Sequence, residues 1–297
     1  MRRIVKCVGR GLLTLFYIVL ALAVLAPIIY MLANAFLSTR EALYRTTLDY
    51  LPFRLLPERV SLSQFAAALG DDPEFYVYFR NSVLLTLPAV GGTVIISALG
   101  GYALAKFRFP GKGILYFFAV FLVMLPTQLL LSPQYILARE TGLLGTRAAV
   151  VLPQIFAPLG LFLMTLFLRA VPDDTLESAR IEGAGEWRIL LQIVLPLSMP
   201  IFATVGLYYL SDRWNEWYHP MIFINSTKKT VLQLVLRNIV NETKQAEDFV
   251  YEGMKELPFT SGVKMACVVM TMLPVMCVYP FLQRYFLKGM RVGAVKG

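Results

Sequence analysis

The sequence has few of the residues on which soluble enzymes and secreted scaffolds depend. Charged residues make up only 16% of the 297 positions, there is one histidine, and three cysteines are too few for a disulfide scaffold. Hydrophobic residues make up 57%, whereas a typical soluble domain has about 45–50%. This composition excludes a disordered or collagen-like chain and most ordinary soluble enzymes, and it indicates a membrane protein.

Motifs that carry catalytic chemistry are also missing. The chain has no G-x-x-x-x-G-K-S/T phosphate-binding loop, no H-E-x-x-H and no C-x-x-C, so it is expected to hold neither a nucleotide nor zinc. No carboxylate or Lys lies in the middle of an apolar stretch, which argues weakly against a self-powered carrier. We therefore predict a non-catalytic chain without a cofactor or metal of its own.

Long apolar stretches are what the chain has in abundance. Six of them are almost free of charge and approach the length of about 20 residues that crosses a bilayer. Backbone polar groups in lipid must be satisfied within the segment, so these spans should be helices. We predict an all-α integral membrane protein, a single domain over residues 1–297, with spans at about 12–35, 82–105, 113–132, 148–168, 195–217 and 265–283.

The first apolar stretch shares features with a signal peptide. Arg2, Arg3, Lys6 and Arg10 precede it, and residues 33–35 (Ala-Asn-Ala) have the form of a cleavage site. The apolar run of about 22 residues, however, is longer than the 7–15 residues of a signal peptide. We expect the stretch to be retained as a membrane anchor.

The distribution of basic residues predicts the orientation. Lys and Arg are about twice as dense in segments 1–11, 106–112, 169–196 and 284–297 as in the segments on the other side of the spans. Both termini and the loop 169–196 should therefore be cytoplasmic. The net charge of +9 is first a signal of topology, since no separate basic run with interleaved aromatics suggests nucleic-acid binding.

Prolines gather in the same stretches. Ten of the 17 lie in or at the edges of apolar segments. Proline removes a helical hydrogen bond and bends the helix. The pattern fits broken helices along a moving pathway, and it equally fits the general frequency of proline in transmembrane helices.

The loop 169–196 has the pattern of a short helix, a glycine turn and a second helix. Pro172 ends the preceding segment, and Asp174 with Glu177 three residues later has the spacing of a capping box. Gly183 and Gly185 then end the first helix.

This predicted helix offers side chains of two kinds to a partner. Glu177 and Glu182 provide carboxylates, and Leu176 and Ile181 provide apolar side chains. The helix is either a docking element for a soluble protein or an ordinary surface helix that joins two spans.

The same loop carries a family resemblance. Glu177-Ser-Ala-Arg-Ile-Glu-Gly183-Ala, followed by Ile193-x-Leu195-Pro196, resembles the EAA loop in permease subunits of binding-protein-dependent ABC importers. Ser and Glu stand where the family pattern has Ala and Asp, and both changes are conservative. Motifs elsewhere resemble the maltose-permease-like carbohydrate branch: Asn81-Ser82, the run from Tyr102 to Gly111, and Trp214-Asn215-Glu216. The ending from Tyr279 to Gly297 is similar to the subgroup that serves pectin- and alginate-type oligosaccharides.

The resemblance implies a type I ABC importer permease fold in the bacterial cytoplasmic membrane. It implies a heterodimer with a second homologous permease, two ABC ATPase subunits that hold ATP and Mg, and an extracytoplasmic solute-binding protein. The residues expected to contact an ATPase are Glu177, Ala179, Ile181, Glu182, Gly183, Ala184 and Gly185. The tail residues Gly293, Lys296 and Gly297 either contact it as well or belong to a frayed end.

Candidates for a substrate pathway or gate lie near the outer end of the fifth span. Trp214, Asn215, Glu216, Trp217 and Tyr218 combine aromatic faces with hydrogen-bonding groups, the chemistry that holds sugars. A ring of Trp and Tyr is equally an interfacial anchoring belt. Seven basic residues in segment 212–264 favour an acidic sugar, although nearby acidic residues reduce that signal.

The sequence thus predicts a permease subunit that imports a carbohydrate, most simply an oligosaccharide. Importers of another solute, such as an amino acid or a phosphonate, and a stand-alone carrier or channel are the alternatives. A carrier usually has an internal repeat, and residues 1–150 and 151–297 show no convincing one. A membrane enzyme would need clustered polar groups at membrane depth.

Overall fold

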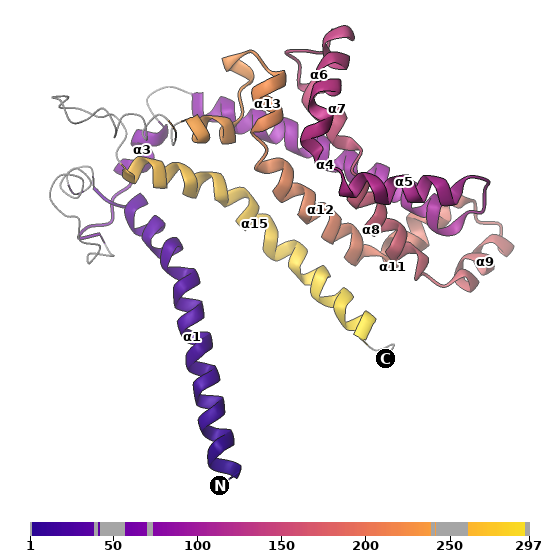
Figure 1. The fold of residues 1–297 in the computed structure, drawn as a ribbon, viewed down its shortest axis with the longest axis horizontal. Coiled ribbons are helices and arrows are strands. Elements are labelled where there is room, and N and C mark those ends of the chain that lie inside the picture. Colours follow the sequence, from indigo (N-terminus) through magenta and orange to yellow (C-terminus); the bar gives the residue numbers. More distant parts are fainter. Residues whose placement is uncertain are drawn as a thin grey trace. The chain divides into compact units, whose positions relative to one another are not determined.

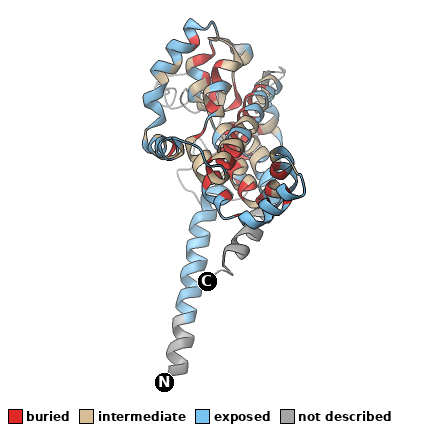
Figure 2. Cartoon of the chain, turned by 90° about the vertical axis from the view of Figure 1, so that its right-hand side faces the viewer, coloured by how far each residue is buried: buried red, intermediate tan, exposed pale blue. Residues whose placement is uncertain are grey.

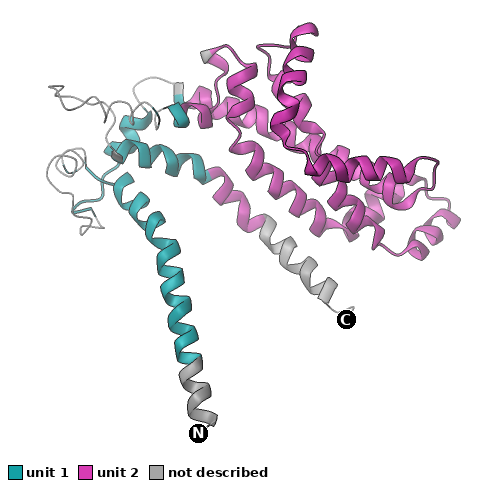
Figure 3. Ribbon diagram, viewed as in Figure 1, with its two compact units in different colours: residues 1–75, 236–273 teal, residues 76–235, 274–297 magenta. Residues whose placement is uncertain are grey.

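The computed structural model describes residues 2–38, 41, 57–69, 74–238, 241 and 261–294, and its regular elements there are helices (Figure 1). The chain forms two compact units, one of residues 1–75 and 236–273 and the other of residues 76–235 and 274–297 (Figure 3). A single domain over the whole chain stays a prediction.

The described part of the chain has four helices long and apolar enough to cross a membrane, or up to six if each of two bent pairs is one span. The prediction of an all-α membrane protein is confirmed, with four to six candidate spans. The four single spans are Arg10–Ala35, Phe75–Lys106, Arg147–Arg169 and Gly262–Phe281. The bent pairs are Lys112–Met124 with Thr127–Glu140, and Glu186–Leu197 with Met199–Trp214.

The first unit contains α1 (Arg2–Ala35), α3 (Ser63–Leu69) and the first part of α15 (Ser261–Ala294). Figure 2 shows α1 exposed along most of its described length, as expected of a helix that faces lipid. Among the side chains of α1 that the structure describes, the buried ones lie at its end, where Asn34 is near Gly262. A Cβ atom on Gly262 would lie 2.9 Å from Cδ of Gln64 and 3.1 Å from the carbonyl oxygen of Asn34. Glycine at this position lets α15 approach α1 and α3 closely.

The second unit contains most of the other helices in the described part of the chain. They are α4 (Glu74–Lys106), which begins in the first unit, α5 (Lys112–Met124), η1 (Thr127–Leu130), α6 (Leu131–Glu140), α7 (Arg147–Ile155), α8 (Pro158–Arg169), α9 (Asp173–Ile181), α10 (Glu186–Ile189), η2 (Leu190–Val194), α11 (Leu195–Leu197), α12 (Met199–Trp214), α13 (Tyr218–Phe223) and η3 (Thr227–Lys229).

The predicted third span, 113–132, is broken rather than continuous. Helix α5 ends at Met124, and the chain turns by 105° before it continues through η1 and α6. Leu125 adopts an extended conformation (φ −80°, ψ 130°). The residue before a proline is disfavoured in the helical region, so Pro126 accounts for the break.

The predicted fifth span, 195–217, is also bent and ends earlier than expected. A π-helical turn, η2, precedes α11, and an 81° bend separates α11 from α12. The bend lies at Ser198 (φ −104°, ψ 14°), between Pro196 and Pro200, each of which lacks the backbone N–H that would continue the helix. Helix α12 then ends at Trp214 rather than at residue 217.

Helix α4 packs against α8 through glycines. A Cβ atom on Gly101 would lie 2.7 Å from Cβ of Met164, and one on Gly100 would lie 2.7 Å from Cδ1 of Leu161. Small residues let two helix backbones approach closely. The C-terminal half of α4 therefore packs closely against α8.

Asn81 holds the other end of α4 to a distant segment of the chain. Its side chain is fully buried, and its amide nitrogen donates to the carbonyl oxygens of Lys228 (2.9 Å) and Thr230 (3.0 Å). Its side-chain oxygen accepts from Nη2 of Arg147 at 2.8 Å, and Oγ of Ser82 accepts from the backbone N–H of Leu232 at 2.9 Å. The Asn81-Ser82 motif thus has a structural role, since a buried amide is stable only when it is hydrogen-bonded.

The close approach of α4 and α8 generates a prediction. Gly101→Ala should lower the free energy of unfolding by about 1–3 kcal/mol, because the new methyl group overlaps Met164. Gly91→Ala, on the same helix with no atom within 4 Å of the new Cβ, is the matched control. It should be neutral or stabilising by up to about 1 kcal/mol, since alanine favours helix. Thermal unfolding of the detergent-purified chain measures both, and equal Tm values for the two variants would contradict the packing argument.

Candidate functional site

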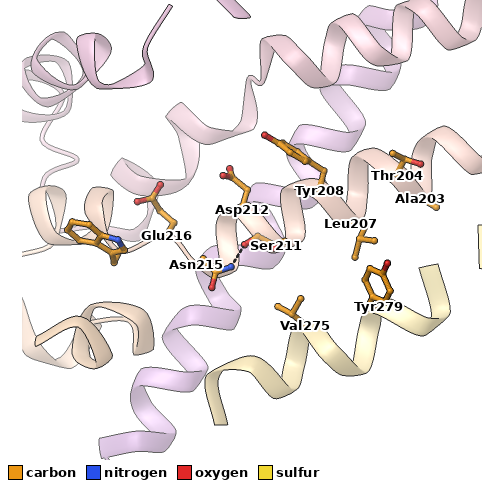
Figure 4. A pocket seen from close by; sticks show the side chains of 11 residues that line it. Ala203, Thr204, Leu207, Tyr208, Ser211, Asp212, Asn215, Glu216, Val275 and Tyr279 are labelled. Atoms are coloured by element: carbon orange, nitrogen blue, oxygen red, sulfur yellow. Dashed lines mark hydrogen bonds between the residues drawn. The ribbon is translucent and has the colours of Figure 1, made fainter. Parts of the chain in front are cut away.

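Two regions of the second unit contain most of the residues that the sequence singles out. One is the segment from α9 to α10, within the predicted cytoplasmic loop. The other is a cavity along α12 (Figure 4).

Helix α9 begins two residues earlier than the capping-box pattern predicts. Pro172 is the N-cap, and no side chain caps the helix, so the prediction that Asp174 forms a capping box with Glu177 is wrong. Pro172 is extended (φ −61°, ψ 132°), the usual conformation of the residue before the first helical turn. The carboxylate of Asp173, in the first turn, lies 2.7 Å from Nζ of Lys106. The hydrogen bond from this ammonium group, and then its positive charge, lower the pKa of Asp173.

Lys106 is the last residue of α4 and joins three segments. Its side chain is only 4% exposed, and Nζ also donates to the carbonyl oxygens of Arg169 and Val171, where α8 ends. The ammonium group therefore satisfies carbonyl groups that the end of a helix leaves without intrahelical partners. It ties the ends of α4 and α8 to the start of α9.

Helix α9 ends in a Schellman turn, as the glycine pattern predicts. Gly183 has φ +84°, its N–H donates to the carbonyl of Arg180 (3.0 Å), and the N–H of Ala184 donates to the carbonyl of Ala179 (2.9 Å). This pattern satisfies the last carbonyl groups of the helix and needs a left-handed residue, which favours glycine. The predicted order of helix, glycine turn and second helix is confirmed.

The two faces of α9 have different surroundings. Leu176 (1% exposed) and Ala179 are buried in a cluster with Tyr102, Ile189 and Val194. The expectation that Leu176 faces a partner is therefore wrong. Ala179, predicted to contact an ATPase, also lies on the buried face of α9.

The other predicted coupling residues lie on or near the surface. Ile181 is 88% exposed, Ala184 is half-buried, and Glu177, Glu182, Gly183 and Gly185 are exposed. Nearby Trp187 is also 67% exposed. Large apolar side chains beside carboxylates form a surface suited to another protein.

A hydrogen-bonded chain joins the end of α9 to α4. Glu186, the first residue of α10, accepts from Nε of Arg180 at 2.7 Å and from the hydroxyl of Tyr102 at 2.7 Å. Sequence reasoning assigned no role to Tyr102, Lys106, Arg180 or Glu186. The signal that could have pointed to two of them is the spacing of four residues between Tyr102 and Lys106, which places both on one face at the end of an apolar helix.

The cavity along α12 has a volume of about 740 Å³. Figure 4 shows Leu207 of α12 facing Tyr279 of α15 across this cavity. Its lining combines hydroxyl, amide and carboxylate groups with aromatic rings and comprises Ala203, Thr204, Leu207, Tyr208, Ser211, Asp212, Asn215, Glu216, Trp217, Val275 and Tyr279. No Lys or Arg is among these residues, and the mixture suits a polyhydroxylated ligand.

The structure brings three of the five predicted pathway residues to this cavity. Asn215, Glu216 and Trp217 line it. Trp214 is buried instead, with its ring edge-to-face against Phe79 at a centroid distance of 5.7 Å. Tyr218 is outside the lining and packs edge-to-face on Trp217.

Glu216 and Asn215 also stabilise the local backbone. Oε1 of Glu216 accepts from the backbone N–H groups of Tyr218 (2.8 Å) and His219 (3.2 Å), at the start of α13. The amide of Asn215 donates to the carbonyl of Ser211 (2.8 Å) and accepts from Nε2 of Gln233 (3.2 Å). Both residues thus shape the turn after α12 as well as the cavity wall.

Sequence reasoning missed the α12 and α15 portions of the lining. Thr204, Tyr208 and Asp212 are spaced by four residues, and Ser211 lies four residues before Asn215. Such spacing places polar groups on a common side of a helix. A row of polar residues in an apolar segment could have indicated a cavity. The position of Tyr279 in the cavity wall depends on tertiary packing, so the sequence alone could not predict it.

Arg213 and Lys229, which belong to the seven outer basic residues, bind groups of the chain itself. Arg213 lies 3.0 Å from Asp212 and donates to the carbonyl of Gln154 at 3.2 Å. Lys229 donates to the carbonyl of Gly145 at 2.6 Å. Lys244 and Lys255, from the same set, lie outside the described residues.

The predicted tail contact falls mostly outside the described residues. Gly293 lies near the end of α15, whereas Lys296 and Gly297 are beyond the described part of the chain. Among the described residues, no group of three or more His, Cys, Asp and Glu side chains could hold a metal ion.

Comparison with known proteins finds a matching family and similar permease proteins. A family model described as "binding-protein-dependent transport system inner membrane component" matches residues 92–292. Protein LplC of Bacillus subtilis (strain 168) is 30% identical, over 91% of this chain and 89% of LplC. The polygalacturonan/rhamnogalacturonan transport system permease protein YtcP of the same organism is 30% identical, over 95% of this chain and 96% of its own.

Solved structures agree with this picture. A chain in the crystal structure of a bacterial ABC transporter involved in the import of the acidic polysaccharide alginate has a TM-score of 0.77 and 27% identity. The match covers 96% of this chain and 97% of that chain. A bacterial alginate ABC transporter in complex with an alginate pentasaccharide-bound periplasmic protein has a TM-score of 0.61 at 10% identity, covers 93% of this chain and 94% of that chain, and shows the fold alone.

The turn after α9 generates a second prediction. Gly183→Ala should destabilise the chain by about 1 kcal/mol, because only the left-handed backbone, and no neighbouring atom, opposes the methyl group. Gly113→Ala is the matched control, since Gly113 lies in helix α5, its φ is not positive and no atom lies within 4 Å of the new Cβ. Thermal unfolding should lower Tm for the first variant alone. An equal Tm for both would show that the turn does not need a left-handed residue.

Proposed function

The chain belongs to the family of binding-protein-dependent transport system inner membrane components, and we propose that it is one of two permease subunits of an ATP-driven oligosaccharide importer. In this proposal the chain itself is not catalytic. Two ABC ATPase subunits hold ATP and Mg, and an extracytoplasmic solute-binding protein delivers the sugar. The second permease is a homologous chain that forms a heterodimer with this one.

The observation that supports this proposal most strongly is the surface of α9. Its inner face is buried and its two ends are tied to α4, while Glu177, Ile181, Glu182 and the glycine turn face outward. A helix fixed in this way can be pushed by a bound protein without moving relative to the helices on which it packs. We propose that an ATPase subunit docks on this face, and that Glu177 binds a basic group there.

The proposed topology counts each bent pair of helices as one span. With six spans, both termini and α9 lie in the cytoplasm, in agreement with the dense Lys and Arg residues of segments 1–11, 106–112 and 284–297. The spans form a single permease domain in the bacterial cytoplasmic membrane. Each bend lies beside proline, where a partner helix or a cavity can satisfy the freed backbone groups.

The cavity along α12 forms part of the sugar pathway in this proposal. Tyr208, Tyr279 and Trp217 offer aromatic faces, and Ser211 and Asn215 offer hydrogen-bonding groups. The relatives whose names specify polygalacturonan or alginate favour an oligosaccharide, and an acidic one in particular. Because this wall has carboxylates and no Lys or Arg in its lining, the counter-charge for an acidic sugar would come from the second permease.

Charge reversal on α9 tests the proposed docking. Glu177→Arg should reduce the amount of ATPase that co-purifies with the tagged chain by about tenfold or more, because it places a cation against a basic partner group. Glu140→Arg, an equal charge change at an exposed position at the end of α6, is the control and should leave the ATPase bound. Quantitative mass spectrometry of the detergent-purified complexes makes the comparison.

Two outcomes would count against the proposal. Normal ATPase recovery with Glu177→Arg would remove the role of this residue in docking. A wild-type chain purified from its native cells without an ATPase or a second permease would favour the alternative of a stand-alone carrier or channel.

A further inference from the structure

Residues in the last turn of α4 are linked by polar contacts to both ends of α9. Lys106 pairs with Asp173 in the first turn of α9, and Tyr102 reaches Arg180, in its last turn, through Glu186. Tyr102 and Lys106 are four residues apart and so lie on the same face of α4. Two polar links from one helical turn thus span the length of a nine-residue helix.

The loss of one link would disturb more of the structure than the loss of the other. Nζ of Lys106 also binds carbonyl groups at the end of α8, so its loss would disturb three segments. The ring of Tyr102 is buried in the cluster beneath α9 and packs edge-to-face on Phe107 at 5.5 Å. Its hydroxyl extends to Glu186. Removing only this oxygen would break the link and leave the packing in place.

The close packing of α4 on α8 would let a displacement of α4 reach α8. Gly101, beside Tyr102, lies so close to α8 that a Cβ atom would be 2.7 Å from Cβ of Met164. Closely packed helices shift together rather than independently. A displacement of α9 that reaches Tyr102 would therefore move α4 and α8 as one body.

We propose that Tyr102 is a positioning residue, whose hydroxyl, through Glu186 and Arg180, makes α4 follow the movement of α9 during the transport cycle. This inference rests on the proposed function, in which an ATPase moves α9. Glu186 accepts a charge-assisted hydrogen bond at 2.7 Å from each of Tyr102 and Arg180, and such bonds are stronger than neutral ones. Without the hydroxyl, α9 would still dock but would transmit its movement poorly.

The test is Tyr102→Phe in the complex that co-purifies with the tagged chain, reconstituted in proteoliposomes with ATP and the binding protein. Uptake is measured for trigalacturonate, an alginate pentasaccharide, arabinotriose and diacetylchitobiose, together with ATP hydrolysis. Hydrolysis should persist, whereas the number of sugar molecules transported per ATP should fall roughly tenfold, the effect expected for losing one hydrogen bond to a charged group. A purely structural role would lower assembly or Tm instead and would leave this ratio unchanged.

Tyr116→Phe is the matched control. Tyr116 is the fifth residue of the apolar helix α5, its ring lies under the guanidinium group of Arg169 at 4.5 Å, and phenylalanine keeps that ring. This variant should transport as the wild type does. Glu186→Gln should lower the ratio as well, and the double variant Tyr102→Phe/Glu186→Gln should be no worse than the worse single variant, because both changes act on one link.

The outcomes are separable. A wild-type complex without ATP-dependent uptake of any of the four sugars would overturn the proposed function together with this inference. A working wild type with an unchanged ratio for Tyr102→Phe, or fully additive losses in the double variant, would overturn the inference alone. If Tyr102→Phe fails to assemble, Glu186→Gln provides the decision, and an unchanged ratio for that variant overturns the inference.

Discussion

The ammonium group of Lys106 is the contact on which the arrangement around α9 depends. It lies where α4 and α8 end and α9 begins, and its side chain is almost fully buried. A buried charge is stable only when it is paired and hydrogen-bonded, and here Asp173 supplies the pairing while backbone carbonyls of the α8 end supply the hydrogen bonds. The direction in which α9 presents Glu177 and Ile181 follows from this junction.

The helical fold could be predicted because its signals are local. Length, apolarity and the absence of charge define a span without any knowledge of its neighbours. The bends could not be placed in the same way. Pro27 and Pro88 lie inside α1 and α4, whereas Pro126 coincides with a 105° break. Whether proline bends a helix or ends it depends on which groups are nearby to satisfy the freed carbonyls, and tertiary packing decides that.

The same distinction applies to the candidate site. Gly183 could be predicted because a left-handed residue at a helix end is a local requirement. Leu176 was assigned to the wrong face because its burial depends on Tyr102 and Ile189, which lie elsewhere in the chain. The cavity residues were found only in part because Tyr279 meets α12 through packing rather than sequence proximity. Asn215 and Glu216 combine a position on the cavity wall with contacts that hold the chain after α12, so one motif provides both shape and surface.

The central claim is that the exposed face of α9 receives an ATPase subunit. Photo-crosslinking tests it most directly, with p-benzoylphenylalanine in place of Ile181, which is 88% exposed, and in place of Leu137 of α6, 63% exposed, as the control. Irradiation in native membranes followed by mass spectrometry should give an adduct with an ABC ATPase from position 181 and none from position 137. An adduct with lipid alone at position 181, or the same ATPase adduct from both positions, would contradict the claim.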